Sequence, residues 1–487
     1  MPFAFRLMPQ TSSAVSLLVS NCILWYRYNL LGLTMWGSLN PQQSSGFLSN
    51  QTKGQKGVAM VTSYFANPKM QEKSGSRRKG ALFIGLLLGV ILALPTSSWA
   101  GVKMKIDEDS SIELGFRMQT QFLSSTNSNA DSSGDHEEKF NIRRASIRVG
   151  GNVTKWVKFF LQVGNNDEPG TDNEANDVNL IDAYINLHTH DLAQIIMGGH
   201  MAPAGRQHLT SSAALMAIDH PGISGYNLTW GLNGGAVFNT AAFEDGNLDL
   251  EGDVNVRDLG ATLFGTFSLN DMVHAKYYVG AYNGIHFMND DDDKERVAAR
   301  VQINFLDPEP NYYNLSTYLG QKKTIGIGAS VDHQQRIAHD LIDDDNVNYI
   351  FYSFDAFADL PVGPGSATIE AGYSNLDLDN STALRDSASG APKNAKETQG
   401  QGFYVQSGYF INNLNLQPWA LYESWYSDAS DDLGSWSAWR VGLTYFIKGH
   451  NANIKVGFEQ FRSDQHIGRI SDDKNIESFL IGFYVSY

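Results

Sequence analysis

The sequence predicts an all-β protein, a transmembrane antiparallel β-barrel of about 16 strands with a long third loop folded inward. Three observations carry this prediction. Apolar residues recur at every second position in one segment after another, which places them on one face of a strand. Short and long connections alternate between these segments, as they do at the two rims of a membrane barrel. The last segment, 476–487, keeps the alternation up to Tyr487.

The last segment is the most informative one. Phe479, Ile481, Phe483 and Val485 share one face, and the residues between them are small, polar or tyrosine, apart from Leu480. A soluble domain seldom exposes such an apolar edge strand, because it invites pairing with other chains. If the strand closes a barrel in lipid, its apolar face is the solvated one. This argues against a soluble, secreted β-rich binding protein.

The N-terminal 100 residues differ from the rest. Residues 77–79 are basic, residues 81–94 are apolar, and Ser98-Trp99-Ala100 offers small residues to a signal peptidase. This pattern is typical of a secretory signal peptide, and the apolar run falls short of the roughly 20 residues that span a bilayer. We therefore predict a signal peptide over 70–100, cleavage after Ala100, and a barrel domain over 101–487.

Residues 1–69 precede this signal and include the only cysteine, Cys22. Because Met70 would be a natural start, we interpret 1–69 as a non-native extension from a misassigned start; a genuine membrane-associated leader is the alternative. The first 100 residues hold nine Lys and Arg against one acidic residue, so cleavage changes the net charge from −16 to −24. So acidic a chain is a poor partner for nucleic acid.

We predict sixteen strands in the mature chain. They cover roughly 111–123, 140–150, 155–164, 178–188, 193–200, 258–267, 273–283, 296–305, 323–332, 348–359, 366–375, 401–411, 415–426, 436–447, 452–462 and 476–487. An even number puts both ends of the barrel at the short-turn, periplasmic rim. Two places stay open: 306–322 is long for a periplasmic turn, and 234–243 is either an extra strand or part of a loop.

The longest connection, 201–257, follows the fifth strand. A wide barrel of sixteen strands needs something to narrow its lumen, and we predict that this third loop folds inward as a constriction. Residues 209–218 within it could form a short helix. The alternative is an outer loop that merely caps the barrel.

Several stretches, in order along the chain, resemble the phosphate-selective porin O and P family. They are I-R-R-A-S-I-R-V-G-G at 142–151, M-G-G-H-M-A-P-A-G at 197–205, R-D-L-G-A-T-L-F-G-T-F at 257–267, G-A-Y-N-G at 280–284, L-Q-P-W-A-L-Y-E at 416–423 and G-L-T-Y-F-I-K-G-H-N-A at 442–452. The resemblance implies a trimeric outer-membrane channel of a Gram-negative bacterium, with sixteen strands and an inward third loop. This agrees with the strand count obtained from periodicity.

If the apolar faces meet lipid, the opposite faces line water. Basic residues fall on these inner faces, and a narrow pore focuses the field of its lining charges. The candidates for pore-lining, anion-binding residues are Arg117, Arg144, Arg148, Lys158, Lys276, Arg300, Arg440 and Lys455. The alternative is that they form cross-strand ion pairs with acids on the same face, such as Asp355, Glu423 and Glu459.

Other chemistry has weak support. The acidic runs 290–293 and 343–345 could hold a divalent cation, but we favour solvated loops, so we predict no metal and no cofactor. An outer-membrane phospholipase or protease would need a nucleophile or paired carboxylates with a histidine, and no such grouping has distinctive spacing. We expect no enzyme and no catalytic residues.

The sequence thus predicts an outer-membrane porin for passive diffusion of small hydrophilic solutes, with a weak preference for inorganic anions such as phosphate. A non-selective or cation-preferring porin is the alternative. The expected partners are these solutes, outer-membrane lipid with lipopolysaccharide, and two further copies in a homotrimer.

Overall fold

The computed structural model describes residues 102–126, 136–165, 178–224, 250–251, 256–284, 286–287, 294–339, 346–379, 381, 384–385, 392–393, 396, 398–430, 434–463 and 474–487. All of them belong to one unit, Thr96–Tyr487. The predicted extension 1–69, the signal peptide 70–100, the possible strand 234–243 and the acidic runs 290–293 and 343–345 lie outside the described residues.

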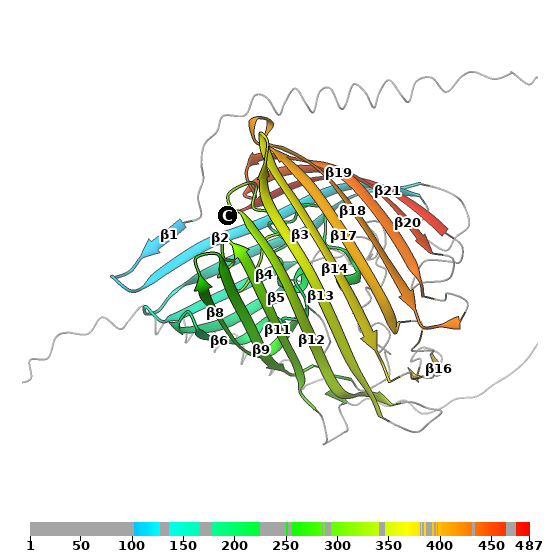
Figure 1. Ribbon diagram of the computed structural model, residues 1–487, viewed down its shortest axis with the longest axis horizontal. Helices are drawn as coiled ribbons and strands as arrows, with labels where there is room; N and C mark the ends of the chain where they lie inside the picture. The colour runs from blue at the N-terminus through cyan, green and yellow to red at the C-terminus, as the bar shows by residue number, and fades with distance from the viewer. Residues whose placement is uncertain are drawn as a thin grey trace, which may run out of the picture. The chain divides into compact units, whose positions relative to one another are not determined.

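Sixteen antiparallel strands form a closed barrel, because the first of them pairs with the last (Figure 1). β2 (Ser111–Thr126) pairs with β21 (Lys474–Ser486), with Phe122 opposite Ile481. The strands between them are β3 (His136–Asn152), β4 (Val157–Asn165), β5 (Asn179–His190), β6 (Ala193–Met201), β8 (Arg257–Asn270), β9 (Val273–Tyr282), β11 (Arg296–Leu306), β12 (Thr324–His339), β13 (Asn346–Val362), β14 (Gly365–Asp377), β17 (Gly400–Ile411), β18 (Leu416–Ser427), β19 (Trp436–Lys448) and β20 (Ala452–Ser463). The predicted barrel of sixteen strands is confirmed.

Smaller strands accompany the barrel. β1 (Val102–Lys105) forms a hairpin with the start of β2, where Val102 faces Leu114. β7 (Leu250–Glu251) pairs with β10 (His286–Phe287), and β15 (Leu384–Arg385) pairs with β16 (Pro392–Lys393). The last two pairs belong to the connections, whereas β1 is hydrogen-bonded to β2 in the main sheet.

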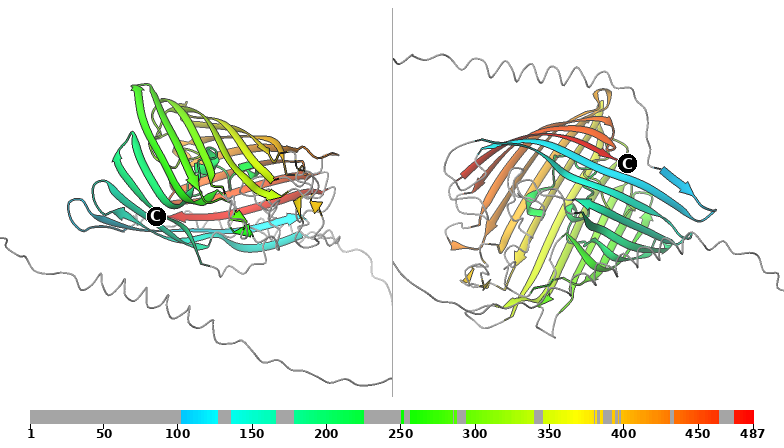
Figure 2. Two further views of the ribbon diagram at one scale, coloured as in Figure 1. Left: turned by 90° about the horizontal axis from the view of Figure 1, so that it is seen from below. Right: turned by 180° about the vertical axis from the view of Figure 1, so that it is seen from behind.

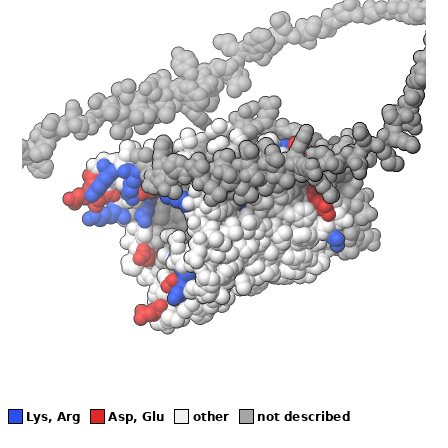
Figure 3. Space-filling model, turned by 90° about the horizontal axis from the view of Figure 1, so that it is seen from above, with Lys and Arg blue, Asp and Glu red and all other residues white. Residues whose placement is uncertain are grey.

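The predicted apolar faces point out of the barrel. Along β11, Val297, Val301 and Phe305 are exposed, while Arg296 and Arg300 between them are buried. Val301 is 59% exposed and Arg300 only 1%, which is the alternation expected when a strand separates lipid from a polar interior. On the side shown in Figure 3, charged side chains lie towards both ends, most of them at one end, and a broad uncharged surface lies between them.

Short connections lie at one rim and long ones at the other. β5 and β6 are separated by two residues, as are β8 and β9. β13 and β14 are also joined by two, of which Gly363 has a φ of +58°, a conformation open to glycine without steric cost. The long connections follow β2, β4, β6, β9, β12, β14, β18 and β20. By the rule for bacterial barrels, the short-turn rim is periplasmic.

One connection at the short-turn rim differs from the others. Between the end of β11 at Leu306 and the start of β12 at Thr324, the chain turns into the barrel and buries Tyr312, Asn314 and Leu319. The sequence marked this stretch as too long for a periplasmic turn but did not predict that it enters the lumen. We call residues 307–323 the inward turn.

A charge on the outer face tests the orientation of the wall. Val301→Arg is expected to lower the free energy of unfolding in lipid by about 2 to 4 kcal/mol, as for a cation near the bilayer midplane. Val362→Arg, at the rim end of β13, is the matched control and is expected to cost about 0 to 1 kcal/mol. Urea titration of the refolded protein in vesicles measures both; equal costs would contradict the orientation.

Candidate constriction site inside the barrel

The third loop enters the lumen directly after β6. From Met201 to Ile218 it is buried except at Ser211 and Ala213, which are half-buried. Its short 3-10 turns, Gln207–Leu209 and Gly222–Ser224, lie inside the ring of strands in Figure 2. The predicted inward fold of this loop is confirmed.

The helix expected over 209–218 does not form. Backbone oxygens in this stretch bind wall side chains: Gln119 Nε2 donates to Ser212 O at 2.9 Å, and Lys455 Nζ donates to Leu215 O at 2.6 Å and Ala217 O at 2.5 Å. These contacts replace the internal hydrogen bonds of a helix. Tertiary contacts therefore outweigh the helix propensity of this segment.

The near end of the third loop is anchored by a buried ion pair. Arg206 donates two hydrogen bonds to Glu309 of the inward turn, at 3.0 and 2.9 Å, and its guanidinium carbon lies 3.8 Å above the ring of Phe357. Its Nε is also 3.8 Å from Glu370 of β14. Burial raises the pKa of the Glu309 carboxyl, but Arg206 outweighs this effect and holds it well below its usual value.

The third loop and the inward turn also pair through their backbones. Asn314 N donates to Leu209 O at 2.8 Å, and Ser211 N donates to Asn314 O at 3.1 Å. Two residues further on, Ser316 N donates to Ala214 O at 3.1 Å. Two segments that enter from opposite rims thus form one constriction across the lumen.

The far end of the third loop is held by Asp219. Its carboxylate accepts a hydrogen bond from Arg143 Nε at 2.8 Å and one from Arg144 Nη2 at 2.9 Å. Burial raises the pKa of Asp219, but the two arginines dominate and keep it well below its ordinary value. Arg144 was predicted to face the lumen; Arg143 was not, because strict alternation points it outward.

A β-bulge explains why Arg143 also faces the lumen. Arg144 pairs with Gln119 and Ile142 pairs with Thr120, so Arg143 is an extra residue in β3. A bulge re-aims side chains at such a point. The only sequence signal for it is the doubled arginine within an alternating strand.

Three predicted basic residues contact the constriction without a carboxylate partner among the described residues. Arg117 Nη1 donates to Ser212 Oγ at 2.6 Å. Lys276 Nζ donates at 3.0 Å to both Asn311 O and Asn314 Oδ1, and Lys455 binds the loop carbonyls given above. All three side chains are buried.

Two other predicted residues form wall ion pairs. Arg300 donates to Asp355 at 2.5 and 2.9 Å. Arg440 bonds to Glu459 at 2.5 Å and also contacts Glu423. The cross-strand pairing that the sequence left open as an alternative therefore holds for Arg300 and Arg440.

The last two predicted residues lie towards the periplasmic rim. Arg148 Nη2 donates to Ser486 Oγ at 2.7 Å and to Tyr487 O at 2.6 Å. Lys158 is the second residue of β4, and its Nζ lies 2.8 Å from Nδ1 of His188. Neither side chain is hydrogen-bonded to the described part of the third loop.

Charges inside the described part of the barrel are balanced in number. Nine basic residues are buried: Arg117, Arg143, Arg144, Arg206, Lys276, Arg296, Arg300, Arg440 and Lys455. Nine acids are buried: Asp182, Asp219, Glu309, Asp332, Asp355, Asp359, Glu370, Glu423 and Glu459. Eight of the acids have an arginine within ion-pair distance. Asp359 instead accepts hydrogen bonds from Thr317, Ser366 and Thr368 and from the Tyr318 amide.

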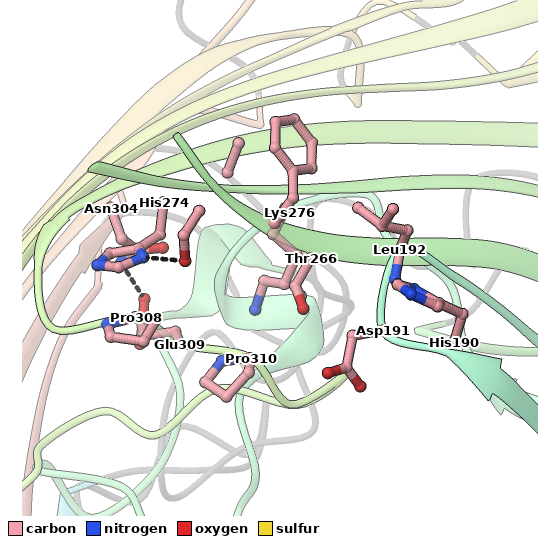
Figure 4. A pocket seen from close by; sticks show the side chains of 13 residues that line it. His190, Asp191, Leu192, Thr266, His274, Lys276, Asn304, Pro308, Glu309 and Pro310 are labelled. Atoms are coloured by element: carbon pink, nitrogen blue, oxygen red, sulfur yellow. Dashed lines mark hydrogen bonds between the residues drawn. The ribbon is translucent and has the colours of Figure 1, made fainter. Parts of the chain in front are cut away.

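A cavity of about 430 Å³ opens beside the inward turn. Lys276, Asn304 and Glu309 line it together with the turn residues His190 and Asp191 (Figure 4). The short turn before β6 and residues of β8 and β9 complete its lining. It is a mixed-charge vestibule on the periplasmic side of the constriction.

A buried histidine makes the third loop sensitive to acid. Burial, with Arg296 and Arg300 nearby, lowers the pKa of His208 to about 3. Neutral His208 therefore contributes stability above its ordinary pKa near 6.5, which is lost as the pH falls towards 3. From pH 7 to pH 4.5 we expect the wild type to lose about 2 to 3 kcal/mol more unfolding free energy than His208→Gln. Urea titrations at both pH values test this; equal losses would contradict it.

Other kinds of site have no support in the described residues. No cluster of His, Cys, Asp or Glu there could hold a metal ion. None of the helices described has the length and apolar character needed to cross a membrane.

A comparison of the sequence with protein families agrees with the barrel fold. Residues 112–267 match the family Phosphate-selective porin O and P. This segment of the chain is that of a porin. It runs from β2 into β8 and includes the third loop, so it holds four of the predicted basic residues: Arg117, Arg144, Arg148 and Lys158. The family match and the barrel indicate a channel in the outer membrane. No match was found among curated protein sequences.

The chain is similar to several solved structures at low sequence identity. Salmonella typhi OmpF, in complex with daunomycin, has a TM-score of 0.50 and 13% identity over 79% of this chain and 100% of its own. The anion-selective porin from Comamonas acidovorans has a TM-score of 0.48 and 11% identity over 78% and 100%. The channel DcaP of Acinetobacter baumannii has a TM-score of 0.44 and 16% identity over 79% and 100%.

Proposed function

We propose that this porin lets small hydrophilic solutes diffuse passively across the outer membrane, with a weak preference for small anions such as phosphate. One observation carries the preference. Arg117, Lys276 and Lys455 are buried at the constriction with no carboxylate partner among the described residues, whereas Asp359 is the one buried acid there without a cation. The buried charges of the whole interior balance, but these three cations lie against the third loop and the inward turn, and we infer a locally positive field there that a narrow pore amplifies.

Most arginines inside the barrel are engaged by carboxylates, so the preference is weak. A guanidinium binds phosphate through two parallel N–H donors. In Arg300 and Arg440 these donors already bind carboxylates. Arg117 has no carboxylate partner and keeps Nε without a hydrogen bond. It is the buried arginine at the constriction whose charge no described carboxylate balances at ion-pair distance.

Single-channel recording under a KCl gradient tests the anion preference. The wild-type reversal potential is expected to be weakly anion-selective. The triple variant Arg117→Gln, Lys276→Gln, Lys455→Gln is expected to shift it towards cations, because it removes the uncompensated charges and leaves Asp359 in place. Lys448→Gln, at the exposed end of β19, is the control without a shift. A cation-selective wild type would establish the alternative, a cation-preferring porin.

A second variant tests the arginines of β3. Arg144→Ala, Arg148→Ala is expected to move the reversal potential towards cations, because Asp219 then keeps only Arg143 as a cationic partner. The same recording measures it. An unchanged potential would show that the two arginines serve structure alone.

The remaining parts of the proposal concern assembly and export. We propose a homotrimer in contact with lipopolysaccharide, a mature chain that starts after Ala100, and no catalytic turnover, so that incubation with phospholipid vesicles or with casein releases no product. Cross-linking of the purified protein tests the trimer, and N-terminal sequencing tests the start of the mature chain. A barrel enzyme of phospholipase or protease type would release product in the incubation.

A further inference from the structure

A pocket of about 360 Å³ lies where β18, β19 and β20 approach the long-loop rim. Tyr422, Ser424, Tyr426, Ser437 and Arg462 are among the residues that line it. Tyr422 and Tyr426 are 43% and 53% exposed and alternate along β18 with the buried residues Glu423 and Trp425. The pocket is therefore on the outer wall of the barrel.

The strand register places its polar residues in one row across the wall. Ser424 of β18 lies opposite Ser437 of β19, which lies opposite Arg462 of β20. Ser424 Oγ donates to Trp436 O at 3.1 Å, which leaves its lone pairs available as acceptors. Arg462 is exposed and forms no ion pair in the described part of the chain.

The rows on the periplasmic side of this one show its depth in the membrane. The next outward-facing row contains Tyr422 and Trp439, with Trp439 Nε1 donating to Gln460 at 2.7 Å. The row after that is apolar, with Ala420, Val441 and Phe458. Tyr and Trp gather where the hydrocarbon of a bilayer gives way to headgroups. The serine and arginine row therefore lies just outside that boundary, at the level of the outer headgroups.

We propose that this pocket binds an outer-leaflet lipid whose sugar headgroup carries phosphate, as in lipopolysaccharide. The Arg462 guanidinium holds the phosphate through charge-assisted hydrogen bonds. The hydroxyl of Ser437 binds a sugar hydroxyl, buried Ser424 forms part of the floor of the pocket, and Tyr422 and Tyr426 cover the apolar edge of the headgroup. The assignment rests on the outer-membrane location but not on the solute preference of the pore.

A lipid fits this place better than a second copy of the chain. Arginine, tyrosine and tryptophan are also common in protein interfaces, so the choice rests on depth: this row lies just outside the aromatic row of Tyr422 and Trp439, at the level of the outer headgroups. An anionic headgroup also supplies the counter-charge that an arginine on the outer wall lacks here.

Binding of purified porin to lipid nanodiscs tests the proposal. The probes are nanodiscs with diphosphorylated lipid A, with its form lacking both phosphates, and with phosphatidylglycerol, each in a phosphatidylcholine background; native mass spectrometry of the released protein counts bound lipid. We expect retention of diphosphorylated lipid A, at least fivefold less in Arg462→Gln and in the pocket-filling Ser437→Trp, and no change in Lys448→Gln. Heat-modifiable migration on gels confirms that each variant is folded.

Four outcomes would overturn the proposal. Equal retention of the phosphate-free form would show that Arg462 does not recognise phosphate, and equal retention of phosphatidylglycerol would remove the sugar requirement. Competition by 10 mM inorganic phosphate would indicate a site for the free ion. A changed oligomeric state in Ser437→Trp with unchanged lipid retention would make the pocket a subunit contact. A cation-selective pore with intact lipid binding would overturn the proposed anion preference alone.

Discussion

Glu309→Gln is expected to destabilise the porin by about 3 to 5 kcal/mol and to raise its single-channel conductance. The carboxylate of Glu309 joins three parts of the constriction. It accepts two hydrogen bonds from Arg206 of the third loop, one from Gln302 at 2.7 Å and one from Asn304 at 2.9 Å of β11, and one from Tyr318 of its own segment. Removing one partner of a buried pair leaves the other charge uncompensated.

Two controls separate this effect from a general loss of charge. Glu113→Gln removes an exposed carboxylate that pairs with Lys103 of β1, and such surface pairs are worth about 0 to 1 kcal/mol. Arg206→Met, Glu309→Met removes both charges and is expected to recover part of the lost stability, because no buried guanidinium is left without its bidentate partner; Glu370 then keeps its hydrogen bonds from Gln207, Tyr404 and Gln406. Urea titration in vesicles measures stability. A conductance unchanged in Glu309→Gln, despite its lower stability, would show that the pair does not position the third loop.

Asp219→Asn is expected to shift selectivity strongly towards anions and to loosen the far end of the third loop. The carboxylate balances both Arg143 and Arg144, so its neutralisation adds a net positive charge at the constriction and leaves two buried guanidinium groups opposed only by a neutral amide. A stability loss of about 3 to 5 kcal/mol is expected from the broken pair. The pKa of Asp219 is lower in the folded state than its ordinary value. The carboxylate therefore stabilises the folded protein at pH values above the ordinary pKa of an aspartate, and this stabilisation is lost as the pH falls towards the lower folded-state pKa.

Reversal potential at several salt concentrations measures the shift. A field from buried charges is screened less than one from surface charges, so the shift in Asp219→Asn is expected to persist at 1 M KCl. Asp191→Asn, in the exposed turn before β6 with its carboxylate 2.8 Å from His188, is the matched control and should show a small, salt-sensitive change. A potential that moves towards cations in Asp219→Asn would contradict the assignment of the site.

The wall of the barrel could be predicted because alternation is a local property of a strand. In β11 the spacing of Val297, Val301 and Phe305 identifies the lipid face without reference to any other part of the chain. The lengths of the connections distinguish the two rims. The closing pair of β2 and β21 follows from the same pattern, since an apolar strand at the end of the chain needs a partner.

The interior could be predicted only in part. Alternation assigned Arg117, Arg300 and Lys455 to the lumen, and all three are buried. It missed Arg143, because a bulge shifts the phase of β3, and it missed Arg206, because a residue in a loop has no face to assign.

The sequence by itself determined the number of strands, their order, the lipid face and the loop that folds inward, because these depend on the spacing of apolar residues along short stretches. Only the tertiary structure decided which charges are compensated. The partners of Arg206 at Glu309 and of Arg144 at Asp219 are 103 and 75 residues away, on segments that enter the lumen from opposite rims. Electrostatic pairing inside a barrel depends on distances across the lumen, and these distances cannot be predicted from a local sequence pattern.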